Sequence, residues 1–208
     1  LNGGAEDSRT WLELGGLRMD AGDFVAARRE FQRSADSARK RLDVEPGNTR
    51  LKLDLAQALH ALGRQAEAES ILRETVKSAP NSTNWLALAQ FLDARAWEMV
   101  TDTMNWRGRR GYGELARAAV RREATSETAD RAVRLLDEAI NAAREAAKLD
   151  ETSARAQFRV GVTRASKDCF EAVRRRISGR ETSQPLDTMI FSRAALAPFE
   201  EAAALDPR

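Results

Sequence analysis

The chain has 208 residues, of which 34 are basic, 32 are acidic and one is a histidine, so its net charge is only +2. This near balance argues against a nucleic-acid-binding protein. A single cysteine and a single histidine exclude an internal disulfide and the usual zinc ligand sets, and no apolar run is long enough to cross a bilayer. We expect a cytoplasmic protein without a metal ion or a cofactor.

The first two helices are expected within residues 8–47. Asp7 or Ser8 can cap a helix that runs to about Asp20, and a glycine-containing turn leads into the next helix. That second helix is unusually long, because alanine and apolar positions continue to Leu42 before Pro46 follows. The sequence therefore predicts a helix hairpin with a lengthened second helix.

The same plan continues with one interruption. Residues 48–81 predict the most regular hairpin, and residues 82–150 predict a third. In the third, the first helix extends to about Asn105 before a stretch rich in glycine and arginine breaks it. An alanine- and arginine-rich helix follows, and Thr125 starts the next one, which ends at Leu149. We therefore expect an insertion at residues 105–126.

A fourth hairpin is expected over residues 151–208. Its first helix runs from about Ser153 to Ile177, a loop extends to Pro185, and a closing helix runs from about Leu186 to Ala204. All predicted elements are helices, since alanine, arginine, glutamate and leucine abound while valine and isoleucine are sparse.

Large and small residues recur at fixed positions of these hairpins. Small residues let two helices cross closely, and large ones fill the space beside each crossing. The recurring residues are Trp11, Leu14, Gly15, Gly22, Ala27 and Phe31, then Leu55, Ala56, Leu59, Gly63, Ala68 and Leu72, then Trp85, Leu88, Ala89, Ala139 and Ala143, then Val160, Gly161, Ala195, Phe199 and Ala202. In this spacing the chain resembles the tetratricopeptide repeat (TPR) family.

The resemblance implies an all-α fold, a right-handed superhelical array of about four TPR-like hairpins with lengthened helices and one insertion. It implies a single domain with repeats at about 8–47, 48–81, 82–150 and 151–208. Lengthened helices are similar to those in TPR regions of bacterial regulatory proteins such as serine/threonine kinases. Because the chain starts without methionine and ends on residues that normally lead into a further helix, we expect part of a longer protein.

The family binds peptides on the concave face formed by the first helix of each hairpin. Transferred residue by residue, the groove would be lined by Leu12, Glu13, Met19, Arg50, Leu53, Asp54, Gln57, His60, Leu86, Gln90, Asp93, Arg155, Phe158 and Arg159. The lysines and asparagines with which chaperone-binding members clamp a carboxylate are missing, because Leu12, Gly16 and Asp54 stand at those positions. Chaperone-tail binding is therefore not expected.

Four further features have a functional and a structural interpretation. The insertion residues Trp106, Arg107, Arg109, Arg110 and Tyr112 have a composition that could contact a nucleic acid, but a solvated loop is the commoner explanation. Cys169 lies among apolar residues and is expected to be a buried thiol. Trp97 is expected to pack on the insertion, on an adjoining repeat or on a partner, and the helix at residues 114–124 is the preferred site. His60 lacks the partners of a catalytic histidine, and with no enzyme motif in the chain we expect no catalytic residue.

The sequence thus predicts a non-catalytic module that binds a peptide or protein segment in its groove. A structural spacer or dimerising element of a multidomain regulatory protein is the alternative, so self-association remains open. The two are distinguished by the oligomeric state and by the character of the groove.

Overall fold

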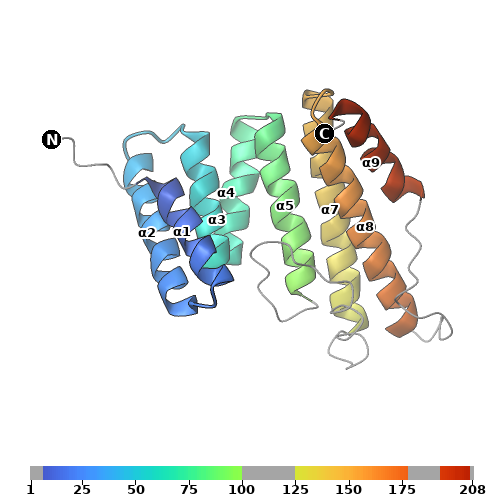
Figure 1. Ribbon diagram of the computed structural model, residues 1–208, viewed down its shortest axis with the longest axis horizontal. Helices are drawn as coiled ribbons and strands as arrows, with labels where there is room; N and C mark the ends of the chain where they lie inside the picture. Colours follow the sequence, from blue (N-terminus) through green and yellow to red (C-terminus); the bar gives the residue numbers. More distant parts are fainter. Residues whose placement is uncertain (1–6, 100–124, 178–192, 207–208) are drawn as a thin grey trace. The chain divides into compact units, whose positions relative to one another are not determined.

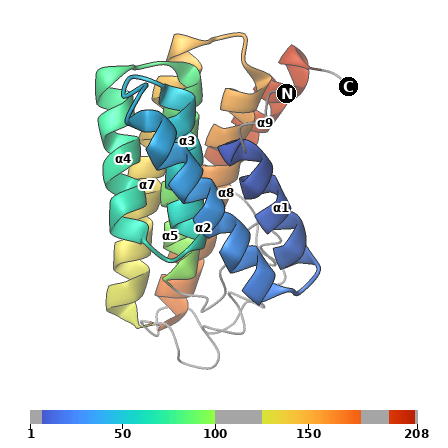
Figure 2. The same cartoon turned by 90° about the vertical axis from the view of Figure 1, so that its left-hand side faces the viewer.

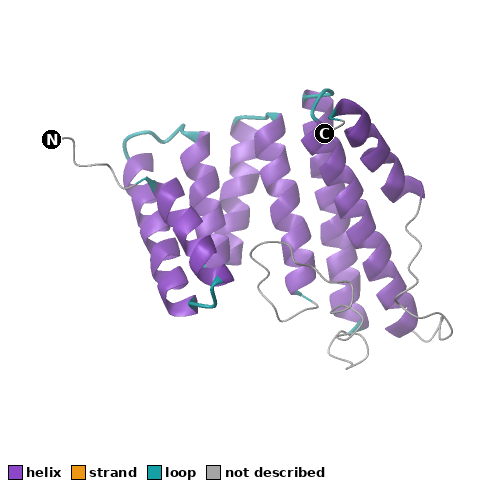
Figure 3. Cartoon of the chain, viewed as in Figure 1, coloured by secondary structure: helices purple, strands orange, loops and turns teal. Residues whose placement is uncertain are grey.

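The computed structural model describes residues 7–99, 125–177 and 193–206 (Figure 1). Eight α-helices and no strand occur in this part of the chain, as Figure 3 shows by colour. The helices are α1 (Ser8–Asp20), α2 (Phe24–Leu42), α3 (Thr49–Ala61), α4 (Gln65–Ser78), α5 (Ser82–Glu98), α7 (Ser126–Leu149), α8 (Ala154–Ile177) and α9 (Arg193–Leu205). They divide into two compact units, Leu1–Pro80 and Asn81–Arg208. The all-α fold that the sequence predicts is confirmed.

The first unit contains α1 to α4, each packed against the next, and α1 also contacts α3 (Figure 2). Gly22 ends α1 and Gly63 ends α3, both with left-handed backbone torsions (φ 79° and 81°). The two turns share one hydrogen-bond pattern, in which the Asp23 N–H donates to the Arg18 carbonyl at 2.9 Å and the Arg64 N–H donates to the Leu59 carbonyl at 2.8 Å. Glycine is favoured at both turns because a Cβ strains this conformation.

A glycine and a phenylalanine meet where α1 crosses α2. An ideal Cβ built on Gly15 would lie 2.5 Å from Phe31 Cε1, so the fully buried ring occupies the space that a side chain would need. The last hairpin repeats the contact, since a Cβ on Gly161 would lie 3.0 Å from the ring of Phe199. In the second hairpin the corresponding residues are Ala56 and Leu72, so a larger first-helix residue is matched by a smaller second-helix residue.

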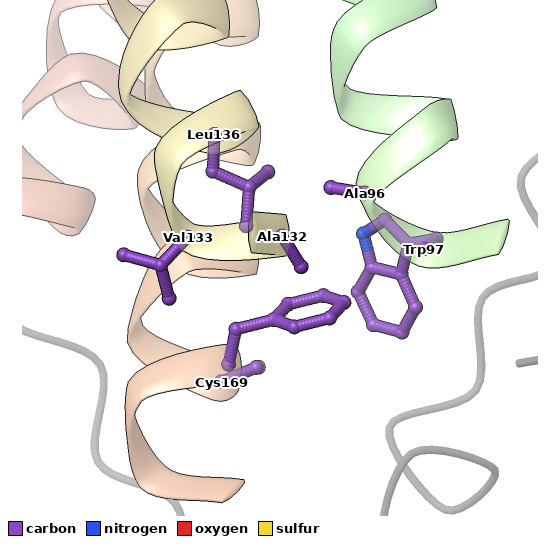
Figure 4. Packing of buried hydrophobic residues seen from close by; sticks show 7 residues of the cluster. Ala96, Trp97, Ala132, Val133, Leu136 and Cys169 are labelled. Atoms are coloured by element: carbon purple, nitrogen blue, oxygen red, sulfur yellow. The ribbon is translucent and has the colours of Figure 1, made fainter. Parts of the chain in front are cut away.

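The second unit is built by α5 packing on α7, α7 on α8, and α8 on α9, with a further contact between α5 and α8. Its core contains Ala96 and Trp97 of α5, Ala132, Val133 and Leu136 of α7, and Cys169 and Phe170 of α8 (Figure 4). The rings of Trp97 and Phe170 meet edge to face, with centroids 5.2 Å apart. The Trp97 indole also donates a hydrogen bond to Ser166 Oγ at 3.2 Å.

Trp97 packs on an adjoining repeat, which is one of the three expected possibilities. Its described partners belong to α7 and α8, and residues 114–124, on which it was expected to pack, lie outside the described part of the chain. The aromatic ring of Phe170 and the hydroxyl of Ser166 give Trp97 an apolar contact and a hydrogen-bond acceptor in its own unit. The prediction that the Cys169 thiol is buried is confirmed.

Several predicted helix ends are confirmed. Asp7 caps α1 by accepting from the Arg9 N–H, and Thr125 caps α7 in a reciprocal pair with Thr128. The extension of α2 to Leu42 and the end of α7 at Leu149 also agree with the ends predicted from the sequence. The first helix of the third hairpin was expected to run to about Asn105, but α5 ends at Glu98, with Met99 as its C-cap. The insertion, the loop to Pro185 and the start of the closing helix fall outside the described residues.

Candidate binding surfaces on the first helices of the hairpins

Four of the residues expected to line the groove are buried in their own units: Leu12, Asp54, Leu86 and Asp93. Leu86 packs with Ala146, Ala147 and Ala156, so it belongs to the core between α5, α7 and α8. The two aspartates contact other helices, as described below. Buried side chains of this kind hold the helices together, and a ligand would reach their neighbours instead.

The remaining expected residues reach solvent to different degrees. Glu13, Arg50, Arg155 and Phe158 are exposed, and Met19, Leu53, Gln57, His60, Gln90 and Arg159 are half-buried. His60 Nδ1 lies 2.7 Å from Gln65 Oε1, so the ring is tied to the start of α4. The edge of the Phe158 ring meets Phe199, with centroids 5.3 Å apart. The insertion residues Trp106, Arg107, Arg109, Arg110 and Tyr112 lie outside the described part of the chain.

Asp54 is the centre of a buried polar network in the first unit. Its carboxylate accepts a hydrogen bond from Ser8 Oγ at 2.9 Å and lies 3.6 Å from Arg9 Nη1. Ser34 Oγ in turn donates to the Ser8 carbonyl at 2.7 Å, which ties α2 to the start of α1. Burial raises the pKa of Asp54, although the Ser8 hydrogen bond and the Arg9 charge act in the opposite direction. The network therefore fixes α3 against α1 at some electrostatic cost.

Replacing Asp54 with asparagine is expected to stabilise the first unit at pH 7. A raised pKa in the folded state means that Asp54 contributes most favourably while it is protonated, and that this contribution is lost as the pH rises through the folded pKa. Asparagine resembles the protonated acid at every pH and can still accept from Ser8. The gain of Asp54→Asn over the parent should therefore shrink as the pH falls toward the ordinary aspartate value of 3.8.

Amide hydrogen exchange of peptides from α1 to α3, measured at several pH values, reports this difference. Asp43→Asn, at an exposed position at the end of α2, is the matched control. A loss of protection in Asp54→Asn at pH 7 would mean that the ion pair with Arg9 outweighs the burial of the charge.

A second buried aspartate joins first helices in the other unit. Asp93 of α5 is completely buried, and its Oδ2 lies 3.5 Å from Nη1 of Arg159 of α8. Asp54 and Asp93 thus both connect the first helix of one hairpin to the first helix of the next. Removing one partner of such a pair leaves a buried charge without compensation, so the pairs favour one register of the two helices.

A pocket of about 290 Å³ lies beside the Asp54 network. Asp7, Arg41, Asn48, Arg50, Leu51 and Asp54 line it. Arg41 Nη1 lies 3.3 Å from Asp7 Oδ1. Asn48 caps α3 by accepting from the Leu51 N–H at 3.2 Å, and its own amide donates to Glu45 at 2.7 Å. Only Arg50 and Asp54 were expected from the sequence as site residues. Arg41 was missed because it belongs to the extension of α2, outside the usual groove positions.

Arg50 is the charged group of this pocket that is free to meet a ligand. Its side chain is exposed and forms no ion pair or hydrogen bond within the described residues, although its charge acts on Asp54. It lies in the first turn of α3, where no acidic residue is present. Since the N-terminal end of a helix carries partial positive charge, both features favour an anionic group at this place.

The hairpins, their glycine turns and the small-to-large crossings find a counterpart among known families. Residues 18–91 match the family model described as tetratricopeptide repeat. This segment of the chain carries tetratricopeptide repeats. Such repeats commonly mediate protein–protein interactions through the surfaces that stacked hairpins expose. A comparison with curated proteins finds no match.

Solved structures of TPR proteins align with most of the chain. TTC0263, a thermophilic TPR protein of Thermus thermophilus, is 17% identical, with a TM-score of 0.42 and 97% of this chain and 92% of that chain covered. YrrB, described as a TPR protein with an unusual peptide-binding site, is 15% identical, with a TM-score of 0.32 and coverage of 98% and 89%. MamA is 16% identical, with a TM-score of 0.26 and coverage of 93% and 94%. Likenesses this distant transfer neither residues nor ligands.

No helix in the described part of the chain has both the length and the apolar character needed to cross a membrane.

Proposed function

We propose that this chain is a non-catalytic module that binds a segment of a partner protein, and that an acidic side chain of the segment enters the pocket beside α3. The tetratricopeptide repeats support the general role, because such repeats commonly act in protein–protein interaction. The observation that carries the proposal is that the exposed side chain of Arg50, unpaired within the described residues, lines a pocket of about 290 Å³.

The charges around the pocket favour one anionic group. Asp7 is paired with Arg41, and Asp54 is engaged by Ser8 and Arg9. Of the two arginines that line this pocket, Arg50 is therefore the one without an ion pair among the described residues, and its planar fork can hold both oxygens of a carboxylate. Leu51 adds an apolar surface against which the stem of an acidic side chain can lie.

Charge reversal at Arg50 is expected to abolish binding of acidic peptides. The test begins with a selection of peptides from a random displayed library on the parent protein, followed by affinity measurement of the selected peptides. For Arg50→Glu we expect roughly a tenfold or greater loss of affinity, because a favourable charge-assisted contact is replaced by repulsion between two carboxylates. Circular dichroism checks that the helices remain.

Arg29→Glu is the matched control, since Arg29 is an exposed arginine of α2 that does not line the pocket. It changes the net charge by the same amount and should leave the affinity within about twofold. Selected peptides that lack acidic residues, or an equal loss of affinity in both variants, would contradict the proposal.

A second candidate function, self-association, is favoured by three exposed apolar side chains near the turn between α1 and α2. Leu17, Phe24 and Val25 expose 57%, 65% and 76% of their surface, and they lie within nine residues of one another in the sequence. Exposed large apolar side chains that gather on a surface are often an interaction site. Sedimentation velocity across a range of protein concentrations tests it, and a monomer at every concentration would remove this candidate.

A further inference from the structure

The two acids that line the pocket beside α3 differ in how firmly they are held. Asp54 is buried, and Ser8 and Arg9 fix its carboxylate inside the first unit. Asp7 lies at the surface, where 49% of its side chain is exposed, and its partner Arg41 exposes 40%. Ion pairs between exposed side chains contribute little to stability, because water solvates both charges when the pair opens. Of the two acids, Asp7 is therefore the one that a ligand can replace at low cost.

Arg41 uses only part of its hydrogen-bonding capacity. Within the described residues its guanidinium donates one hydrogen bond, from Nη1 to Asp7 Oδ1 at 3.3 Å. Arg64, in contrast, holds Glu67 with two hydrogen bonds of 2.6 Å each, the paired arrangement in which arginine binds a carboxylate most tightly. A carboxylate that meets Arg41 with both oxygens would therefore bind it better than Asp7 does.

Asp7 has a second role that restricts how it meets Arg41. The same oxygen, Oδ1, accepts the backbone N–H of Arg9 at 3.4 Å and so caps α1. An N-cap side chain must point back to the first turn of its helix, which limits the orientation of the carboxylate toward Arg41. If Arg41 is released, Asp7 keeps the cap and remains in contact with water. The exchange of Asp7 for a ligand therefore leaves no buried charge without a partner.

Arg41 and Arg50 line the same pocket of about 290 Å³. Arg41 comes from the last turn of the lengthened α2, and Arg50 comes from the first turn of α3. Arginine side chains are long, and both of these reach solvent. A carboxylate that enters the pocket to meet Arg50 can therefore also contact Arg41, and each positive charge attracts it.

We propose that Arg41 is a second ligand-binding residue of this pocket and that Asp7 is its internal competitor. In the free protein Asp7 holds Arg41. An acidic side chain of the partner segment displaces Asp7 from Arg41 and is then bound by Arg41 together with Arg50. Asp7 thereby lowers the affinity of the pocket for acidic segments. This inference rests on the proposed function, because it concerns the same pocket and the same kind of ligand.

The probe for this role is a blocked pentapeptide with one central glutamate between glycines, and its glutamine counterpart is the control ligand. The full chain, labelled with ¹⁵N, is titrated with each peptide while the side-chain Nε–H signals of Arg41 and Arg50 are followed. In the parent protein we expect saturable shifts of both signals with the glutamate peptide. In Asp7→Asn we expect roughly three- to tenfold tighter binding, because the ligand no longer competes with a carboxylate for Arg41.

Matched variants separate this competition from folding and from overall charge. Asparagine and serine cap a helix about as well as aspartate does, so Asp7→Asn and Asp7→Ser should both keep α1 intact, as circular dichroism can check. Asp43→Asn removes one negative charge at an exposed position outside the pocket lining and should keep Kd within about twofold. In an Arg41→Gln background, Asp7→Asn should change Kd by no more than about twofold, because no arginine is left for which Asp7 competes.

Four results would overturn this inference and leave the proposed function intact. Shifts confined to Arg50 would show that Arg41 does not bind the ligand. Equal affinity of the parent and Asp7→Asn would show that Asp7 does not compete. A gain from Asp7→Asn that persists in the Arg41→Gln background would show that Asp7 repels the ligand and does not act through Arg41. Equal gains in Asp7→Asn and Asp43→Asn would show that only the overall charge matters.

Failure of the proposed function itself would give a different pattern. The glutamate and glutamine peptides would then bind equally to the parent and to Asp7→Asn, or Arg50→Glu would leave the affinity for the glutamate peptide unchanged. Either result would remove the anion site, and the role of Asp7 with it.

Discussion

Replacing Gly15 with alanine is expected to lower the free energy of unfolding of the first unit by roughly 1–3 kcal/mol, the usual range for an overpacked core. The new methyl group would lie 2.5 Å from Cε1 and 2.6 Å from Cδ1 of Phe31, distances that neither group can keep. Phe31 is fully buried, so its ring cannot move away freely. The loss should appear even though alanine favours the helix over glycine by about 1 kcal/mol.

The contact can be tested by restoring the space that alanine removes. Phe31→Leu in the Gly15→Ala background reproduces the alanine and leucine that the second hairpin has at Ala56 and Leu72. The double variant should therefore lose less unfolding free energy than the two single variants lose together, and the difference, the coupling energy, should be about 1 kcal/mol or more. Amide hydrogen exchange of α1 and α2 measures all four proteins. Simple additivity would show that the ring and the glycine do not compete for the same space.

Replacing Trp97 with alanine is expected to cost the second unit about 3–5 kcal/mol. The substitution opens a cavity between α5, α7 and α8, removes the edge-to-face contact with Phe170, and leaves the Ser166 hydroxyl without the indole donor. The neighbouring residues Ala96 and Ala132 have side chains too small to fill the space that the indole leaves.

Trp97→Phe separates the two parts of this effect. It keeps an aromatic ring against Phe170 and loses the hydrogen bond to Ser166, which is worth about 1 kcal/mol. Hydrogen exchange of α5, α7 and α8 is the measurement, and α1 to α4 provide the internal reference. Similar losses in the alanine and phenylalanine variants would mean that the indole N–H, and not the ring, supports the core.

Local signals made much of the fold predictable. The cap at Asp7, the threonine pair that starts α7 and the glycine at the first turn each act within a few residues, so the sequence contains the whole cause. The length of α2 was predictable for the same reason, because the apolar spacing continues through Leu42. Helix ends of this type need no knowledge of the tertiary structure.

Burial was harder to predict than helix position. Asp54 and Asp93 were expected to face a ligand, because aspartate is usually exposed and the family pattern places these positions in the groove. Their burial depends on Ser8, Arg9 and Arg159, which are far away in the sequence. Trp97 was expected to need a cover outside its hairpin, and the cover among the described residues is Phe170 of α8.

The ion pairs between α7 and α8 were missed although a signal was present. Asp130 and Asp137 are spaced by seven residues on one helix, and Arg174 and Lys167 have the same spacing on the next. Comparing the two spacings would have paired the two acids with the two bases. Which residues of two antiparallel helices meet, however, is set by their register, and the register follows from the packed core.

The labelling rate of Cys169 can report how often the core of the second unit opens. It is the chain's one cysteine, and it is buried beside Trp97 and Phe170 in the core of that unit. A thiol reagent can reach it only when the helices around it separate, so the rate of labelling reports how often that core opens. Because the first unit has no cysteine, the labelling rate does not change when α1 to α4 open. A single thiol reagent can therefore measure the opening rate of the second unit separately from that of the first.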